Sequence, residues 1–407
     1  MHPVLFEVPL PRVALPLAAL LVAAVLAGLA VAELGRRARA TDLVVVGLVG
    51  AVLALASTRG AGGARILIAP LPVYGFGALL CAALSVGWFL TLALARRDGL
   101  RVDAVGAVYF VAALSGLVGA RVLYVLTNLG DFASFPDVLA FRSGGLVFYG
   151  GAIGGAAGSA LAAARWRVPW LAWADVAAPS LAVGSALGRV GCYLAGCDYG
   201  VPLPAGTPRW LARVGTFPRW PDDVAGPSAG APAWIDHVLR RELPLDSTAS
   251  LPVHPTELYE SAGALLLLAS LALVRSRIRF RGQVFLTYVL GYALLRFVIE
   301  ILRDDPERGL HGPALAPALL FPLGLGILAA CWAMGPFRVL ASHSRRAVTV
   351  AGFVGAFALV RVLIRALPAA PASLSTSQWI ALGSSVAASA AFHALARPSR
   401  PAGAPAA

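Results

Sequence analysis

Residues 283–302 read QVFLTYVLGYALLRFVIEIL. A helix of about 20 mostly apolar residues is long enough to cross the hydrocarbon core of a bilayer. Two charged residues, Arg296 and Glu300, stand inside this stretch, and their spacing places them on one face of a helix. Charged residues within membrane spans usually face the interior of a bundle and carry function. The stretch therefore predicts a membrane helix with a functional face.

Similar apolar runs recur along the whole chain. They predict eleven spans, at about 13–33, 42–57, 72–95, 104–126, 145–165, 172–194, 257–274, 283–302, 314–334, 347–367 and 377–396. The composition agrees, because 59% of the 407 residues are hydrophobic and 13% are charged, whereas a soluble domain carries roughly 25% charged residues. We expect an all-α, polytopic integral membrane bundle of about 11 transmembrane helices.

The distribution of arginine predicts the orientation of these helices. One set of alternating loops holds more arginines than the other, namely 34–41, 96–103, 165–171, 275–282, 335–346 and the residues after 396. Cytoplasmic loops carry such an excess. We therefore expect the N-terminus outside and the C-terminus inside. No basic segment precedes the first span, so it is expected to be retained rather than cleaved as a signal peptide.

The spans divide into a two-helix extension (1–66), a core (67–338) and a second two-helix extension (339–407). Within the core, the Pro-rich loop 198–255 is expected to be an external, irregular cap without a core of its own. The net charge is +13, but the basic residues lie between apolar blocks. Their expected partners are anionic membrane lipids rather than nucleic acid. Four cysteines are too few for a disulfide scaffold, and no pattern predicts a cofactor.

Four arginines lie within the predicted spans: Arg121, Arg189, Arg296 and Arg361. With the orientation above, the first three fall in the outward parts of their spans. Tyr74, at the outward start of the span 72–95, lies at the same depth. Buried cations of this kind usually mark a functional site. A purely structural Arg–Glu pair remains an alternative for Arg296 with Glu300.

Three further segments reach this depth. Residues 143–151 (SGGLVFYGG) include Gly144, Gly145, Gly150 and Gly151, residues 188–200 (GRVGCYLAGCDYG) include Cys192 and Gly200, and residues 254–260 (HPTELYE) include His254, Tyr259 and Glu260. Glycine lets backbones approach closely and leaves amides open to a ligand, although tight helix packing would also explain it. Helix capping would likewise explain the acids. With arginine, the natural partner of a phosphate, these segments predict an outward-facing pocket for a lipid phosphate.

These motifs, in this order, resemble the bacterial prolipoprotein diacylglyceryl transferase family. The resemblance runs from about Pro72 to Arg338 and is strongest at Gly188-Arg189-Val190-Gly191 with Gly196 and Gly200. The other matching features are the Pro-x-Tyr-Gly start at Pro72, Gly-Ala-Arg at Arg121, the Gly-Gly run before Tyr149, Asp175 with Pro179, residues 254–260, and Arg296-Phe297 with Glu300 and Arg303.

The resemblance implies a reaction and its location. The family moves the diacylglyceryl group of phosphatidylglycerol to the Cys sulfur of a prolipoprotein signal peptide, so that a thioether forms and glycerol 1-phosphate leaves. The site faces the periplasmic side of the bacterial inner membrane. On this basis Arg189 and Arg296 hold the leaving phosphate, Glu300 orients Arg296, and Tyr74 bounds the headgroup site. The resemblance implies neither a metal nor a cofactor.

This sequence departs from the family pattern at three positions. Tyr149 stands where the family usually has His, Cys192 where it has Asn, and Cys197 where it has Glu. The His is a candidate base in the family, so Tyr149 is grouped with the catalytic residues, although a phenol with a pKa near 10 is a poor base. Cys192 and Cys197 lie at the oxidising face, where they could form a disulfide.

Two other functions therefore stay open. A paralogue could use the same lipid pocket for another transfer or a redox reaction through Cys192 and Cys197. A non-catalytic, lipid-binding scaffold is the second, and the retained Arg189, Arg296 and Glu300 argue against it. A metal site from Cys192, Cys197 and His254 has weak support.

Overall fold

The computed structural model describes most of the chain from residue 71 onward. The described residues are 4–8, 14–16, 65–67, 71–132, 138, 145–220, 230–339, 347, 351–352, 354–355, 358 and 370–396. The chain divides into two compact units, one formed by Val4–Tyr74 and the other by Met1–Pro3 with Gly75–Ala407.

The smaller unit contains two antiparallel strand pairs. Strand β1 (Val4–Val8) pairs with β4 (Leu71–Tyr74), and β2 (Ala14–Pro16) pairs with β3 (Arg65–Leu67). The spans predicted at 13–33 and 72–95 are therefore wrong at their starts. Proline fixes its own backbone angle and pushes the preceding residue away from the helical region, and Pro16 and Pro72 lie in these strands. The rest of the span 13–33 and the span 42–57 lie outside the described residues.

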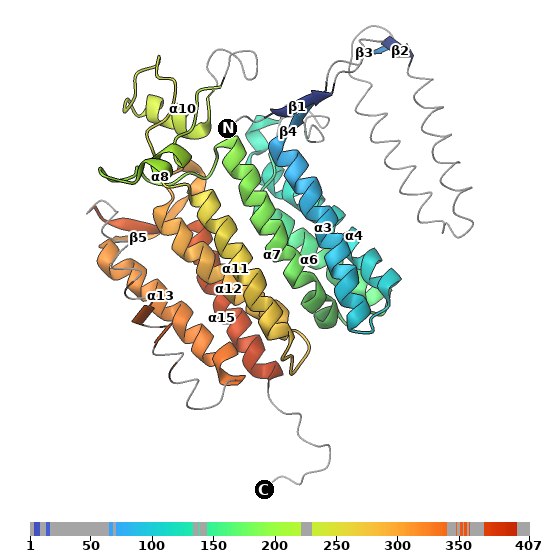
Figure 1. Ribbon diagram of the computed structural model, residues 1–407. Helices are drawn as coiled ribbons and strands as arrows, with labels where there is room; N and C mark the ends of the chain where they lie inside the picture. Colours follow the sequence, from blue (N-terminus) through green and yellow to red (C-terminus); the bar gives the residue numbers. More distant parts are fainter. Residues whose placement is uncertain are drawn as a thin grey trace, which may run out of the picture. The chain divides into compact units, whose positions relative to one another are not determined.

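The larger unit is mostly helical (Figure 1). Its long helices are α3 (Gly75–Arg97), α4 (Val102–Thr127), α6 (Phe148–Arg165), α7 (Trp170–Ala195), α11 (Thr256–Arg275), α12 (Gln283–Leu302), α13 (Pro317–Met334) and α15 (Thr376–Leu395). Short 3₁₀ helices occupy Leu129–Asp131, Pro306–Arg308 and Pro336–Val339. The all-α prediction thus holds here except for one strand pair, β5 (Leu310–Leu315) with β6 (Ala372–Ser375).

Six helices in the described part of the chain are long and apolar enough to cross a membrane: α3, α4, α7, α11, α12 and α13. This confirms a multi-pass helical membrane protein. Helices α6 and α15 form as helices where spans were expected, but they are not among these six. Most of the span predicted at 347–367, including Arg361, lies outside the described residues. The count of eleven spans and the orientation stay predictions.

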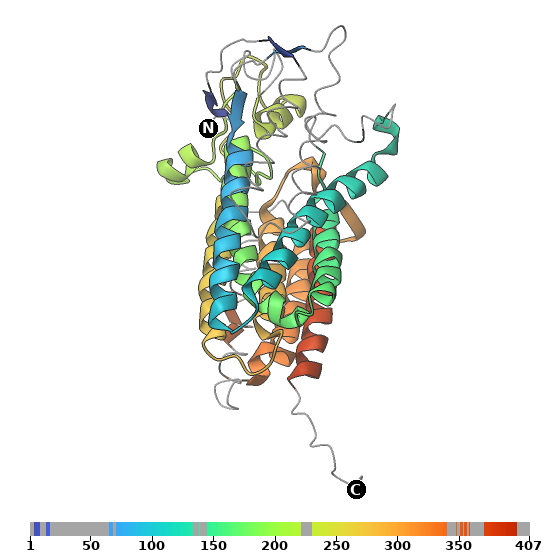
Figure 2. The ribbon, with the colours of Figure 1, turned by 90° about the vertical axis from the view of Figure 1, so that its right-hand side faces the viewer.

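The helices of the larger unit pack side by side. Helix α3 packs on α7, α11 packs on both α7 and α12, and α15 packs on α12 and α13. Helices α4 and α6 pack closely against each other and lie side by side in Figure 2. A Cβ at Gly150 would lie 2.3 Å from the carbonyl oxygen of Gly119, and one at Gly119 would lie 2.4 Å from that of Gly150. Only glycine permits this approach.

The loop 198–255 contains helices α8 (Arg209–Val214) and α10 (Pro232–Leu239), beyond one end of the helices (Figure 1). Its buried apolar side chains form a small cluster: Tyr199, Phe217, Ala231, Ala233 and Val253. The prediction that this loop lacks a core of its own was therefore wrong. Two aromatic side chains bury enough apolar surface to order a Pro-rich segment.

Candidate active site

Three helix ends of the larger unit meet at a group of charged side chains. Helix α7 ends there, α11 begins there and α12 ends there, on the side of the bundle nearest α8 and α10 (Figure 1). Six charged side chains come together: Arg189, Asp198, Glu260, Arg296, Glu300 and Arg303. Arginine and acid alternate among them to form a closed ring.

One half of this ring links the two predicted phosphate-binding arginines through an acid. Nε of Arg189 forms an ion pair with Oε1 of Glu260 at 3.1 Å, and Arg296 donates from Nη1 to Oε2 of the same carboxylate at 3.0 Å. Tyr292 also donates to Glu260, at 3.2 Å. Glu260 was predicted to bind substrate. Its contacts fix the spacing between two guanidinium groups from different helices. Substrate contact by Glu260 stays a prediction.

The other half of the ring closes through the end of α12. Glu300 pairs with Nη2 of Arg296 at 2.8 Å, as the sequence analysis predicted, and with Nη1 of Arg303 at 3.5 Å. Arg303 pairs in turn with Asp198, which also pairs with Arg189. Outside the ring, Asp305 accepts from Nε of Arg303 at 2.6 Å.

Asp198 and Arg303 were not among the site residues predicted from the sequence. The sequence nevertheless contained a signal for both of these residues. A buried arginine such as Arg189 requires an acidic partner, and Asp198 is an acid in the same glycine-rich segment. Arg303 belonged to a matched motif. Burial alone would raise the pKa of Asp198, but the guanidinium groups of Arg189 and Arg303 lower it below its ordinary value, so the carboxylate stays ionised at neutral pH.

Exposure separates Arg189 and Arg296 from the two glutamates that hold them. The side chains of Arg189 and Arg296 are 17% and 11% exposed, whereas those of Glu260 and Glu300 are 1% and 0% exposed. These two arginines are therefore more accessible than the glutamates between them, and Asp198, at 26%, is the most exposed member of the ring. Because a guanidinium carries five N–H donors, each can bind a phosphate oxygen without first giving up all of its carboxylate contacts.

Tyr149 reaches this site through a second hydroxyl. Its Oη donates to Oγ of Ser377 at 2.6 Å, and Nη2 of Arg296 donates to the same oxygen at 3.2 Å. Tyr149 lies on α6 and Ser377 on α15. The structure thus brings Tyr149 next to Arg296, and it adds Ser377, which was not predicted from the sequence.

His254, Tyr259 and Gly200 lie beside the ring. Nδ1 of His254 lies 3.4 Å from Oη of Tyr259, and the amide of Gly200 donates to the carbonyl of His254 at 3.0 Å. A Cβ at Gly200 would lie 2.7 Å from the carbonyl oxygen of Leu302, so glycine lets this strand fit against the end of α12. Burial lowers the pKa of His254, which keeps its imidazole neutral at pH 7. Substrate contacts by these three residues stay predictions.

Arg121 holds the backbone between α4 and α6. Its Nε donates to the carbonyl of Val138 at 2.8 Å, and its Nη1 donates to that of Gly145 at 3.1 Å. Gly145 has φ 82°, a backbone angle that favours glycine, and a Cβ at this position would collide with the ring of Tyr124. These contacts show that Arg121 and Gly145 stabilise the connection between α4 and α6. Their roles in substrate binding stay predictions.

The substrate-binding roles of the remaining predicted site residues stay predictions. Gly150 and Gly151 lie in the first turns of α6, where Gly150 serves the close packing against α4. Gly144 lies outside the described residues, and Tyr74 ends β4 in the smaller unit.

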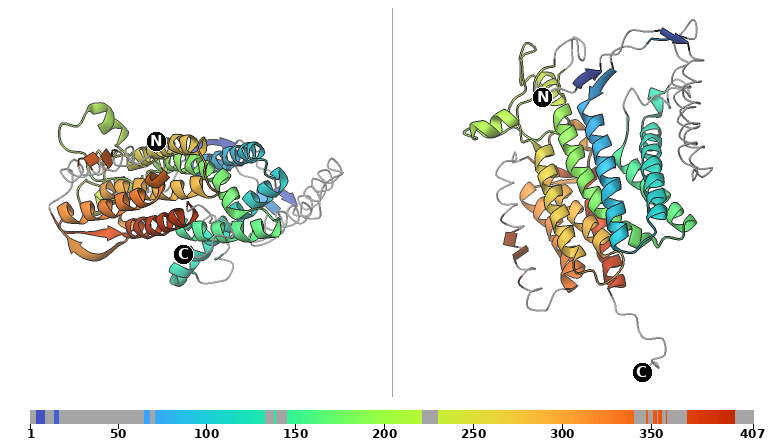
Figure 3. Two further views of the ribbon diagram at one scale, coloured as in Figure 1. Left: turned by 90° about the horizontal axis from the view of Figure 1, so that it is seen from below. Right: turned by 45° about the vertical axis from the view of Figure 1, so that its right-hand side comes forward.

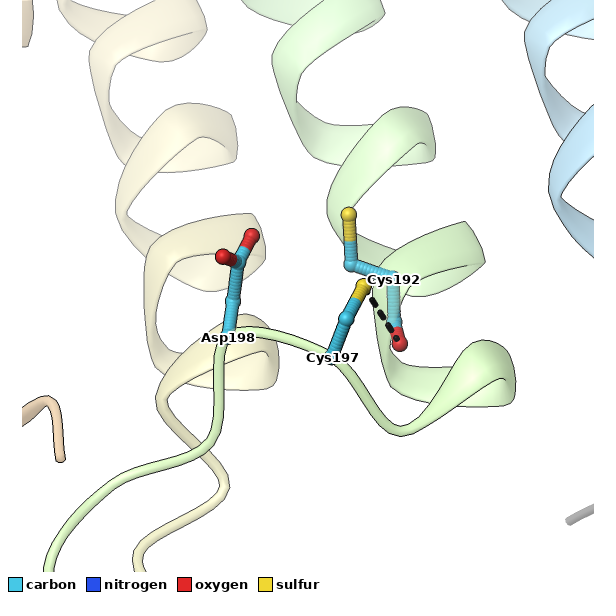
Figure 4. A group of neighbouring side chains, drawn as sticks. All are labelled: Cys192, Cys197 and Asp198. Carbon is cyan, nitrogen blue, oxygen red and sulfur yellow. Dashed lines mark hydrogen bonds between the residues drawn. The ribbon is translucent and has the colours of Figure 1, made fainter. Parts of the chain in front are cut away.

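Cys192 and Cys197 lie beside the ring at the end of α7 (Figure 4). Both are free thiols, and their sulfur atoms and a carboxylate oxygen of Asp198 lie within 4.8 Å of one another. Both carboxylate oxygens of Asp198 already accept from arginines. A metal ion would have to compete with two guanidinium groups for the charge of Asp198, which makes this cluster a poor metal site.

We expect the double variant Cys192→Ala with Cys197→Ala to keep its transfer rate within a few-fold of the wild type. Among the described residues, no hydrogen bond joins either thiol to a side chain of the ring, and Cys197 donates to the carbonyl of Cys192 at 3.6 Å. The measurement is the initial rate of lipid transfer to an acceptor peptide. A loss of transfer with normal membrane insertion would instead favour the paralogue that reacts through these thiols.

Comparison with known proteins assigns this ring to a family. The family model described as prolipoprotein diacylglyceryl transferase matches residues 64–335. The chain belongs to this family. The match spans α3 to α13 and includes the whole ring, but not α15. The resemblance inferred from the sequence and the prediction of a transferase are both confirmed.

Three relatives illustrate how similar the chain is to other members of the family. Each is named a phosphatidylglycerol–prolipoprotein diacylglyceryl transferase. The protein of Clostridium tetani is 27% identical over 239 residues, covering 58% of this chain and 83% of the relative. The protein of Thermus thermophilus is 34% identical, covering 58% and 81%. That of Synechococcus elongatus is 31% identical over 298 residues, covering 71% and 93%.

Proposed function

We propose that the protein transfers the diacylglyceryl group from phosphatidylglycerol to the lipobox cysteine of prolipoproteins, at the outer face of the bacterial inner membrane. One observation carries this proposal. Arg189 and Arg296, from two different helices, are held by the single buried carboxylate of Glu260. Two fixed guanidinium groups suit the oxygens of one phosphate, and membership in a diacylglyceryl transferase family supplies the reaction.

The chemistry is displacement at carbon. The thiol sulfur attacks the glyceryl carbon that bears the phosphate, the C–O bond to the phosphate breaks, and the thiol proton is lost to a base. A thioether forms and glycerol 1-phosphate leaves. Negative charge grows on the departing phosphate, so arginines already held in place stabilise the transition state more than the ground state. Glu260 and Glu300 keep these arginines in place before the lipid arrives.

The test is transfer by the full-length protein in proteoliposomes that contain labelled phosphatidylglycerol and a lipobox peptide. We expect labelled thioether product and one glycerol 1-phosphate for each peptide modified. Inserted, folded protein without any transfer would contradict the proposal. In that case Tyr149→His tests whether a stronger base restores the reaction, since an imidazole with a pKa near 6.5 accepts a proton far more readily at neutral pH.

The orientation gives a separate prediction. The excess of arginine in alternate loops favours a cytoplasmic C-terminus, and this places the ring at the end of α7 on the outer side. A C-terminal fusion to a reporter that works only in the cytoplasm should be active, whereas one that works only outside should be silent. The reverse result would overturn both the outward site and the odd number of spans.

A further inference from the structure

Helix α15 lies beyond the region that matches the family, yet it is anchored next to the ring. Strand β6, which leads into it, pairs with β5, the strand that follows α12 closely in the chain. The amide of Thr376 donates to the carbonyl of Gly309 at 2.9 Å, and Nε2 of Gln378 donates to that of Phe297 at 3.3 Å. These polar contacts fix the start of α15 against α12.

Apolar packing fixes the rest of the helix. Leu374, Ala381 and Leu382 share one buried cluster with Phe297 and Leu320. The view along the helices in Figure 3 shows α15 beside α12 and α13. Because lipid tails are as apolar as these side chains, the docked position is favoured by close van der Waals packing rather than by removal of apolar surface from water. Helix α15 is therefore an integral part of the helical unit.

The first turn of α15 is locked by a capping box. The amide of Gln378 donates to Oγ of Ser375 at 3.2 Å, and the amide of Ser375 donates to Oε1 of Gln378 at 3.0 Å. This reciprocal pair sets where the helix begins. It therefore also sets the direction of Ser377, which stands within this turn and is buried.

Ser377 accepts two hydrogen bonds from the site. One comes from Oη of Tyr149 at 2.6 Å and the other from Nη2 of Arg296 at 3.2 Å. Nη2 of Arg296 also pairs with Glu300. The hydroxyl of Ser377 therefore joins three helices, α6, α12 and α15, at the arginine that is proposed to hold the leaving phosphate.

We propose that Ser377 is a positioning residue for the transfer reaction, and that the C-terminal extension completes the active site by supplying it. The inference rests on the proposed function. Ser377 acts through Arg296, whose outer nitrogen it holds in the plane needed by the phosphate, and through Tyr149, whose hydroxyl it keeps beside that arginine. Arg296 retains Glu260 and Glu300 when Ser377 is lost, so the consequence falls on geometry rather than on folding.

The test compares Ser377→Ala with Ser377→Thr in the full-length protein. We expect Ser377→Ala to lower kcat by about 10-fold to 100-fold, the range for loss of a hydrogen bond to a charged group, with KM for phosphatidylglycerol nearly unchanged. Ser377→Thr keeps the hydroxyl and should recover most of kcat. In a Tyr149→Phe background, Ser377→Ala should cost less than it does in the wild type, because one of its two contacts is already gone.

The matched control is Ser385→Ala. Ser385 lies on the same helix, is fully buried, and its hydroxyl has no hydrogen-bond partner among the described residues. Its replacement should leave both transfer and the unfolding temperature unchanged. If Ser377→Ala also transfers at the wild-type rate, the positioning role is wrong. If Ser377→Thr is as slow as Ser377→Ala, the hydroxyl is not what matters and the inference fails.

A second measurement separates this inference from the proposed function. Glycerol 1-phosphate binding to the detergent-solubilised protein, followed by its shift of the unfolding temperature, requires no catalysis. Ser377→Ala should weaken this binding about 10-fold. A wild type that binds glycerol 1-phosphate but transfers nothing would refute the proposed function alone, while the Ser377→Ala effect on binding would still support the positioning role. A wild type that neither transfers nor binds would overturn both.

Discussion

Replacing either Arg189 or Arg296 with lysine is expected to lower kcat for diacylglyceryl transfer by about 10²–10³-fold, the usual cost of losing one donor to developing charge. Lysine keeps the positive charge but offers a single ammonium group in place of a planar fork. Arg189 contacts both Glu260 and Asp198, and Arg296 contacts both Glu260 and Glu300. One ammonium cannot satisfy two carboxylates in these directions and still meet a phosphate oxygen.

The measurement is the initial rate of transfer from labelled phosphatidylglycerol in proteoliposomes, normalised to inserted protein. The matched control is Arg275→Lys. Arg275 ends α11, at the opposite end from Glu260, and pairs with Asp98 at 2.6 Å. It should transfer at close to the wild-type rate. Rates near wild type for both Arg189→Lys and Arg296→Lys would show that neither guanidinium holds the phosphate.

The sequence was sufficient to predict the long helices, because each is a mostly apolar run of about 18 to 26 residues, but it did not predict the short helices α8 and α10. It also predicted the pair of Arg296 and Glu300. Two residues four apart on a helix lie next to each other whatever the helix packs against. The errors fell at the ends of spans. Pro16 and Pro72 stand in strands where helix was expected, since hydropathy alone does not register the backbone restriction of proline.

The contacts that close the site could not be predicted in the same way. Glu260 was read as a substrate residue because its position in the chain says nothing of its two arginine partners, which lie on other helices. Ser377 lies 81 residues from Arg296 and 228 from Tyr149, in an extension with no matching motif. Such contacts depend on how helices pack, and a single serine leaves no periodic signal in the sequence.

Glu260 and Glu257 offer the sharpest test of the ring, because they are two equally buried acids in the first turns of α11. Each is 1% exposed. Glu260 pairs with Arg189 and Arg296, whereas Glu257 makes no ion pair with any described residue and both of its carboxylate oxygens are buried without a hydrogen-bond partner there. Identical substitutions should therefore have opposite consequences.

We expect Glu260→Gln to lower the free energy of unfolding by about 3–5 kcal/mol, the cost of removing one partner from a buried ion pair, and to abolish most transfer. The neutral amide leaves two buried guanidinium groups with one carboxylate fewer between them, so they repel each other and lose their spacing. Glu257→Gln should be neutral or stabilising, because it exchanges one buried polar group without a hydrogen-bond partner for another of the same shape that never carries a charge. Unfolding midpoints in detergent and transfer rates measure both effects. Equal stability of the two variants would mean that Glu260 does not hold the arginines, and the proposed phosphate clamp would then lose its structural basis.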